Sequence, residues 1–188
     1  MQAKREAIFQ ATRKLLARHD FHDLKMDDVA RRAGIAKGSL YLYFKDKDSV
    51  YSGLVQSLFD KLFPLLSQTL QSDMEPIGLL HGALKTQVLF FEQHIDVFTH
   101  FFREGPGSSA REKSLKDSFC EYVRRLTDII KEGIRRKQFR NVDPNKAALI
   151  LIGMIRSAIV ERIHGFTEEP LSADIEKIWD IYIHGVGQ

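Results

Sequence analysis

The sequence predicts an all-α protein with an N-terminal helix-turn-helix head of three helices and a C-terminal body of six helices for ligand binding and dimerisation. Apolar residues recur at helical spacing along nearly the whole chain, and no stretch alternates as a half-buried strand does. Two short helical patterns meet at Gly34, as in a helix-turn-helix. With 188 residues, 44% of them hydrophobic, the chain can bury a sizeable core, and no apolar run is long enough to span a membrane.

The head is expected to occupy residues 1–46. Residues 3–18 form an amphipathic pattern whose apolar stripe can support two further helices. The patterns on either side of Gly34 are each too short to be stable alone, because so few residues do not overcome the cost of helix nucleation. We therefore expect both to pack against the first helix, with Gly34 supplying the positive φ of the turn.

The body is expected to occupy residues 47–188, beginning with a connecting helix over 47–63 that carries movement between body and head. Pro64 should bend or end that helix, because proline lacks an N–H and crowds the preceding turn. Asp143 and Pro144 are the expected cap and first residue of a later helix. The remaining helical patterns cover residues 76–93, 95–102, 110–137, 144–163 and a last segment from 172.

The second helix of the predicted helix-turn-helix, which follows Gly34, has a surface suited to DNA. Lys37 and Gly38 open it, where free N–H groups attract phosphate and the absent side chain of glycine permits close approach to a groove. Tyrosine hydroxyls and the ammonium of Lys47 are further phosphate-positioning groups. A solvated helical hairpin is the alternative interpretation. The predicted DNA contacts are Lys25, Lys37, Gly38, Ser39, Tyr41, Leu42, Tyr43 and Lys47.

Residues 24–47 resemble the DNA-binding signature of the TetR family of bacterial transcriptional regulators, most clearly in Ala-Gly-Ile-Ala-Lys-Gly-Ser-Leu-Tyr-Leu-Tyr-Phe followed by Lys47. Three positions depart from the family's usual pattern. Lys25 stands where a capping Thr is common, Ala36 where a capping Ser is common, and Leu42 where a polar or aromatic phosphate contact is common. The alanine side chain has no oxygen to accept a hydrogen bond from a backbone N–H, which forgoes about 1 kcal/mol at the start of the second helix.

Charge and cysteine content agree with this interpretation. Residues 1–63 hold 12 Lys and Arg against 8 Asp and Glu, whereas residues 64–188 hold 16 against 17. A modest positive surplus in the head favours nucleic acid as the partner. The single cysteine, Cys120, excludes an intrachain disulfide framework, and the charged N-terminus has no apolar signal core, so we expect a cytoplasmic protein.

The segment 147–160 is apolar on most sides, so it must be buried on most sides. We expect it to meet its copy in a homodimer, together with the last helix, an arrangement that the resemblance also implies. The alternative is a helix wholly inside one chain. The predicted interface residues are Ile152, Ile155, Ile159, Ile175, Trp179 and Tyr182.

Five of the thirteen phenylalanines fall between residues 90 and 102. Such a stripe is often plain core, but the resemblance implies a small molecule bound between helices of the body, and these residues favour an apolar or amphipathic one. The predicted ligand-binding residues are Phe90, Phe91, His94, Phe98, Phe101, Phe102, Phe119 and Tyr122.

The sequence therefore predicts a DNA-binding regulator, by the family's habit a repressor, that leaves a palindromic double-stranded operator when the ligand binds. A helix-turn-helix activator, a ligand-independent regulator and a helical protein-interaction module are the alternatives. Catalysis is not expected, because no His-x-x-x-His pattern, Gly-rich phosphate loop or nucleophile elbow occurs. Neither a metal nor a cofactor is predicted.

Overall fold

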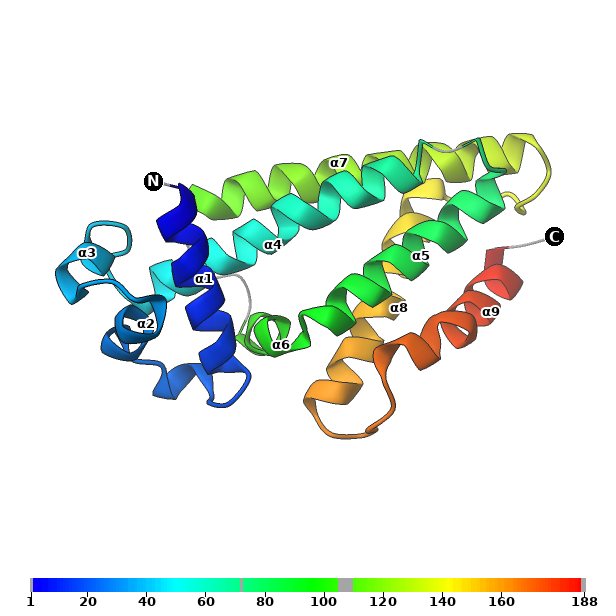
Figure 1. Ribbon diagram of the computed structural model, residues 1–188. Helices are drawn as coiled ribbons and strands as arrows, with labels where there is room; N and C mark the ends of the chain where they lie inside the picture. The colour runs from blue at the N-terminus through cyan, green and yellow to red at the C-terminus, as the bar shows by residue number, and fades with distance from the viewer. Residues whose placement is uncertain (1, 72, 105–109, 187–188) are drawn as a thin grey trace. The chain divides into compact units, whose positions relative to one another are not determined.

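The computed structural model describes residues 2–71, 73–104 and 110–186, and the side chains of 3–71, 73–101 and 116–185. Within these ranges the chain is built from α-helices and two short 3-10 helices, with no strand (Figure 1). No helix in the described part of the chain is both long enough and apolar enough to cross a membrane. The predicted all-α fold is confirmed.

The nine described α-helices follow one another with short connections. A 3-10 helix, η1 (Phe21–Asp23), precedes α2, and another, η2 (Leu171–Asp174), precedes α9. The helices are α1 (Gln2–Leu16), α2 (Met26–Ala33), α3 (Lys37–Tyr41), α4 (Lys47–Thr69), α5 (Pro76–Gln93), α6 (Ile95–Glu104), α7 (Ala110–Arg135), α8 (Pro144–Ile163) and α9 (Ile175–Val186).

The chain divides into two compact units, and each is described by itself. One unit holds the described residues up to Phe59 and those from Ile95 to Glu112, which include α6. It is larger than the predicted head, and we call it the head from here on. The other holds the segment Asp60–His94 and the described residues from Lys113 onward, and we call it the body.

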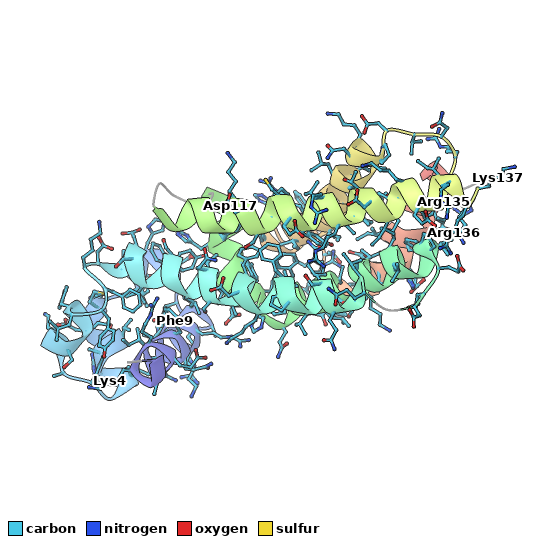
Figure 2. All side chains as sticks on the ribbon, turned by 90° about the horizontal axis from the view of Figure 1, so that it is seen from above. Lys4, Phe9, Asp117, Arg135, Arg136 and Lys137 are labelled. Carbon is cyan, nitrogen blue, oxygen red and sulfur yellow. The ribbon has the colours of Figure 1, made fainter. Side chains whose placement is uncertain are left out.

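The core of the head forms where α1, α2 and α3 meet the start of α4. Ile8, Val29 and Leu40 have no exposed surface, and the rings of Phe9 and Phe44 lie 5.7 Å apart (Phe9 is labelled in Figure 2). These residues come from three different helices and one turn, so the short α2 and α3 are held by packing, as their length requires.

Helix α6 also packs in the head. The Tyr51 hydroxyl of α4 donates to the Val97 carbonyl at 2.6 Å, and Arg13 of α1 pairs with Asp96 at 3.4 Å. The His100 ring stacks on Phe21 with centroids 4.0 Å apart. An element that lies far along the sequence thus completes the packing of the helix-turn-helix unit.

Helix α4 continues through Pro64 to Thr69, although the sequence favoured a bend or an end at the proline. Pro64 is exposed, so its missing N–H falls on the solvent side of the helix. Leu62 and Leu66 on the other side are buried and continue the apolar stripe. Packing of this stripe offsets the lost hydrogen bond, which explains why the helix persists.

Helix α5 lies where the sequence predicted a helix, and it buries one helical stripe of side chains. The stripe consists of Leu79, Leu80, Ala83, Leu84, Gln87, Val88 and Phe91. Pro76 and Phe90 are buried as well. Helices α5, α8 and α9 lie side by side (Figure 1). Asp143 caps α8 by accepting from the backbone N–H groups of Asn145 and Lys146 at 2.9 and 3.1 Å, as expected of that Asp-Pro pair.

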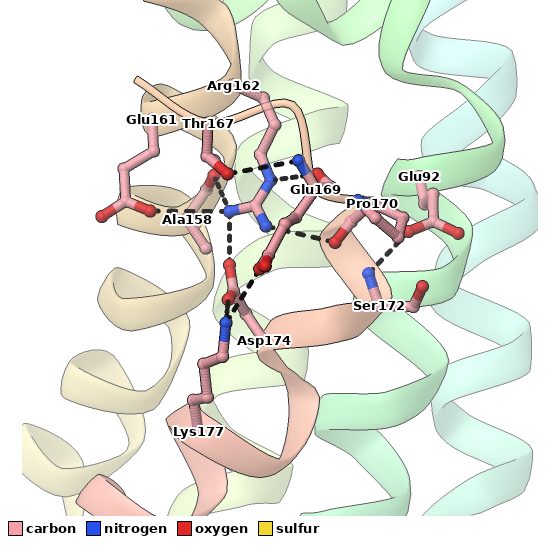
Figure 3. Close-up of polar contacts among 10 residues, drawn as sticks. All are labelled: Glu92, Ala158, Glu161, Arg162, Thr167, Glu169, Pro170, Ser172, Asp174 and Lys177. Atoms are coloured by element: carbon pink, nitrogen blue, oxygen red, sulfur yellow. Dashed lines mark hydrogen bonds and ion pairs between the residues drawn. The ribbon is translucent and has the colours of Figure 1, made fainter. Parts of the chain in front are cut away.

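The connection between α8 and α9 is fixed by Arg162, whose guanidinium pairs with Asp174 and donates to the carbonyls of Ala158 and Pro170 at 3.0 and 3.1 Å (Figure 3). Lys177 reaches the other oxygen of Asp174 at 3.2 Å. Burial raises the pKa of the Asp174 carboxyl, but the hydrogen bonds and charges of Arg162 and Lys177 outweigh it, so the pKa lies below its usual value.

In the connection between α7 and α8, the Phe139 ring packs against the end of α7. A Cβ on Gly133 would lie 2.2 Å from the Phe139 ring, so only glycine fits there. Lys137 takes a positive φ of 58° to close the turn, and Arg136 reaches Glu75 at 2.9 Å (Arg136 and Lys137 are labelled in Figure 2).

The body covers most of the residues expected at the dimer interface. Four of these, Ile155, Ile159, Ile175 and Tyr182, are buried within the single chain, while Ile152 and Trp179 are half-buried. A side chain that its own chain covers has little surface left for a partner. Among the described side chains of α8 and α9, the large apolar ones that remain exposed are Leu149, Ile150 and Ile181.

Candidate nucleic-acid interface

The turn between α2 and α3 is built around Gly34, whose φ of 68° and ψ of 32° lie in the left-handed region. The Ile35 N–H donates to the Ala30 carbonyl at 3.1 Å, and the Gly34 N–H donates to the Arg31 carbonyl at 3.3 Å. Together these bonds form a Schellman motif that ends α2 and turns the chain toward α3. The predicted role of Gly34 is confirmed.

Helix α3 is short and ends at Tyr41, before Tyr43 and Phe44. The N–H groups of these two residues still donate to the Leu40 carbonyl, each at 3.0 Å, so one turn follows the helix. No side chain caps the start of α3, since Ala36 occupies the N-cap. So short a helix has only a small dipole, and its side chains must supply most of the attraction for phosphate.

The outer surface of α3 and the following turn, which we call the recognition surface, carries side chains that the head does not cover. Tyr41 is 47% exposed and Leu42 is 85% exposed, although both are large. Gly38 is also exposed, and a Cβ placed on it would meet nothing within 4 Å. Ser39 and Tyr43 are half-buried at the margin. Most predicted DNA contacts therefore lie on one small part of the head.

Lys37 does not stand alone on this surface. Its Nζ lies 2.7 and 3.0 Å from the two carboxylate oxygens of Asp27, which belongs to the first turn of α2. The hydrogen bond and the charge of Asp27 raise the pKa of the Lys37 ammonium. Lys37 therefore carries a full positive charge on the recognition surface, partly neutralised by its neighbour.

Lys47 occupies a different setting from the one expected. Its Nζ donates to the carbonyls of Phe21 and His22 at 3.2 and 2.8 Å and lies 4.9 Å from the centre of the Phe21 ring. Lys47 thereby stabilises η1. This structural role is separate from any contact of Lys47 with DNA phosphate. Lys25 is exposed at the start of α2, where its side chain makes no capping hydrogen bond.

A groove of about 510 Å³ lies on another face of the head, between α1, η1 and α2. Asp28 and Arg31 line it and form an ion pair within α2. Leu15, His19 and Leu24 contribute from the other two elements and their flanks. The neighbouring carboxylates thus have different surroundings: Asp27 pairs with Lys37 of α3, whereas Asp28 lies in the groove.

The predicted ligand-binding residues are divided between the two units. Phe98 is buried in the head and Phe101 lies near it, whereas the other described members belong to the body. In the body, Phe90 and His94 have ring centres 4.6 Å apart, and the Tyr122 hydroxyl donates to the Gln87 side-chain oxygen at 2.9 Å. Burial raises the pKa of Tyr122.

Two other members of the ligand set differ in exposure. Phe91 is buried on α5, but Phe119 is 39% exposed on α7. The side chain of Phe102 falls outside the described residues. No group of three His, Cys, Asp or Glu side chains in the described part of the chain is arranged to hold a metal ion.

Sequence reasoning missed three features of the head. Phe9 is buried beside Ile8, a doublet that marks a broader apolar face than the single stripe we assigned to the first helix. Asp27 was overlooked because it lies ten positions before Lys37, and only the turn brings the two together. The packing of α6 against the head depends on long-range contacts for which the local pattern holds no signal.

Comparison with known proteins identifies the family. The model for the N-terminal part of bacterial regulatory proteins of the tetR family matches residues 8–54. A second, for the tetracyclin repressor-like C-terminal domain, matches residues 74–160. The two matches fall on the helix-turn-helix and on the larger helical part of the chain.

Related proteins are regulators of transcription. An uncharacterised HTH-type transcriptional regulator of Haemophilus influenzae is 33% identical over 104 residues, 54% of this chain and 48% of that protein. The chain thus aligns with about half the length of that relative. The HTH-type transcriptional repressor KstR2 of Mycobacterium tuberculosis is 22% identical over 142 residues, 74% of this chain and 71% of the repressor.

Among solved structures, the transcriptional regulator FadR from Bacillus subtilis in complex with stearoyl-CoA superposes with a TM-score of 0.80 at 17% identity. The match covers 96% of this chain and 98% of FadR, so the whole fold is shared. The two family matches and the helix-turn-helix geometry lead to one conclusion: the chain belongs to the TetR family and is a DNA-binding transcriptional regulator, not an enzyme.

Proposed function

We propose that the chain is a homodimeric repressor that binds a palindromic operator through two copies of the recognition surface and leaves it when an amphipathic ligand binds the body. The observation that carries this proposal is the exposed set of Lys37, Tyr41 and Leu42 beside a well-packed head. The lysine attracts phosphate, the tyrosine hydroxyl can donate to it, and the leucine can contact the methyl group of thymine. Residues 1–46 act as the DNA-binding domain and residues 47–188 as the regulatory one, in the cytoplasm where the operator is accessible.

The dimer uses the side chains that the body leaves exposed. Ile150 is 56% exposed on α8, Ile181 is 65% exposed on α9, and Gly153 follows Ile150 on the same face of α8 with open space around it. A glycine there permits close approach of a second helix. Two-fold symmetry then sets the recognition surfaces roughly one DNA turn, about 34 Å, apart, which requires a palindromic target.

A fatty acyl chain carried on coenzyme A is the first ligand class to test. FadR, which shares the fold, is named as a complex with stearoyl-CoA. The body of this chain has the apolar phenylalanines for a hydrocarbon chain, and the Tyr122–Gln87 pair could orient a polar group. Shifting the DNA-competent fraction from 99% to 1% requires about 5.5 kcal/mol of differential ligand affinity between the two states.

Selection of genomic fragments by the purified protein, followed by a salt titration of the best fragment, tests DNA recognition. We expect one palindrome whose half-sites are about one turn apart, and affinity that falls steeply with salt because bound phosphates release counterions. Absence of any enriched sequence at low salt would refute the proposal and favour the protein-interaction module.

The dimer and the ligand are tested separately on the selected fragment. Ile150→Glu should yield monomers in sedimentation and lose operator binding, whereas Leu89→Glu, at an exposed leucine on α5, should leave the dimer intact. Stearoyl-CoA should release the operator, while coenzyme A alone and stearate alone separate the contributions of nucleotide and chain. Operator affinity unchanged by all three compounds would rule out this ligand class.

A further inference from the structure

The ion pair between Asp27 and Lys37 joins the two helices of the helix-turn-helix on its DNA-facing side. Lys37 is the first residue of α3, and its ammonium contacts both oxygens of the Asp27 carboxylate at 2.7 and 3.0 Å. A phosphate that approaches this ammonium must either displace the carboxylate or lie beside it. A second negative group at that distance opposes phosphate binding.

The pair is weak enough to exchange. Its side chains are 60% and 59% exposed, and ion pairs in water contribute at most about 1 kcal/mol. The lysine can therefore give up the carboxylate when other contacts hold the head against DNA. Where no such contacts form, the ammonium stays with its internal partner.

We propose that Asp27 is a specificity-determining residue, which weakens binding to DNA of random sequence by holding the Lys37 ammonium in an internal ion pair. On the operator, contacts from the rest of the recognition surface to base edges offset the loss of that pair. Random DNA offers no matching base edges, so the same loss is not offset. The inference rests on the proposed contact of Lys37 with phosphate.

Asp28 provides a control within the same turn of α2. Its carboxylate pairs with Arg31 of the same helix, and Asp28 lines the groove between α1, η1 and α2, to which no residue of α3 contributes. Asp27→Asn and Asp28→Asn each raise the net charge by one. A comparison of the two variants therefore separates a local effect on Lys37 from an effect of overall charge.

The test measures the anisotropy of a fluorescent duplex of random sequence, about three helical turns long, over a series of KCl concentrations. We expect Asp27→Asn to bind this duplex about two- to fivefold more tightly, with a slope of log affinity against log salt steeper by about one phosphate contact. Asp28→Asn should leave the slope unchanged. Asp27→Glu, which keeps a carboxylate near Lys37, should stay close to the unaltered protein.

The same measurement in a Lys37→Gln background completes a double-mutant cycle between Asp27 and Lys37. There Asp27→Asn should no longer strengthen binding, because the ammonium that it releases is gone. Equal gains from the two asparagine variants, or a gain that survives without Lys37, would overturn the inference. If Lys37→Gln alone leaves affinity for the random duplex unchanged, the proposed phosphate contact itself fails. Circular dichroism melts confirm that each variant is folded.

Discussion

The head and the body reach stability by different means. In the head, short helices are held by aromatic rings that meet from distant points of the sequence, as Phe9 meets Phe44 and His100 meets Phe21. In the body, long helices bury broad aliphatic stripes, and polar networks such as that of Arg162 fix their connections. The head exposes Tyr41 on α3 and Leu42 directly after it, whereas the body exposes aliphatic side chains on α8 and α9.

This difference explains why the sequence of the head indicates its function more directly than that of the body. DNA presents the same phosphate spacing to every member of a family, so the residues that meet it recur in a fixed order. A ligand cavity has no such common partner, because many combinations of apolar side chains can enclose a given molecule. Substitutions in the two units should therefore damage different properties.

The largest effect is expected from Arg162→Ala in the body. It leaves the carboxylate of Asp174 in a mostly covered site without its main partner, and loss of one member of such a pair costs about 3 kcal/mol or more of unfolding free energy. Urea denaturation of the whole chain measures the change. Arg18→Ala, at an exposed position in the head, should change the midpoint little, and comparable losses from the two variants would contradict the assignment.

Gly133→Ala should cost about 1–3 kcal/mol, because the new methyl group overlaps the Phe139 ring, which is itself buried. Gly153→Ala is the control in α8, where a Cβ meets nothing in the same chain; because Gly153 lies on the proposed dimer face, this control is measured in the monomeric Ile150→Glu background. There the substitution should stabilise the chain by roughly 0.5–1 kcal/mol, as alanine does in an exposed helix. Opposite signs in thermal denaturation are the expected result; a shared sign would mean that the Phe139 packing is not rigid.

Acidification should weaken the body through Asp174. The pKa of this carboxyl is lower in the folded chain than in the unfolded one, so its stabilising effect is present above the unfolded pKa and disappears as pH falls through the folded value. Unfolding free energy measured from neutral pH to below about pH 4 should decrease, and less so in Asp174→Asn. An identical pH dependence in the variant would assign the acid sensitivity to other carboxylates.

The smallest effect is a gain in the head. Ala36→Ser supplies the missing cap of α3 and should stabilise the chain by about 0.5–1 kcal/mol. Removal of an existing cap by Asp46→Ala should cost a similar amount, because the Asp46 carboxylate accepts from the Ser49 N–H at 2.7 Å at the start of α4. Thermal denaturation measures both changes. A lower melting midpoint for Ala36→Ser would mean that α3 does not accept a serine cap.

Much of the fold could be predicted from the sequence because its signals are local. The register of α5, the turn at Gly34 and the cap at Asp143 each depend on residues within a few positions. Contacts between distant segments could not be predicted in this way, which is why the α6 packing and the Asp27–Lys37 pair emerged only with the structure.

The predicted dimer residues show a related difficulty. A pattern that is apolar on most sides indicates burial but not by which chain. The single chain buries Ile155 and Ile159, and their place at an interface stays a prediction. The continuation of α4 beyond Pro64 has a similar origin, since whether a proline ends a helix depends on tertiary packing that its neighbours in sequence do not reveal.

Pro64 also affects how α4 bends. The helix is continuous from Lys47 to Thr69, and the boundary between the two units falls at Phe59 and Asp60. The hydrogen bond that proline cannot donate is the one that would have reached the carbonyl of Asp60, four residues earlier. The turn from Asp60 to Pro64 thus lacks one of the hydrogen bonds of α4, so any bending of this helix should concentrate there.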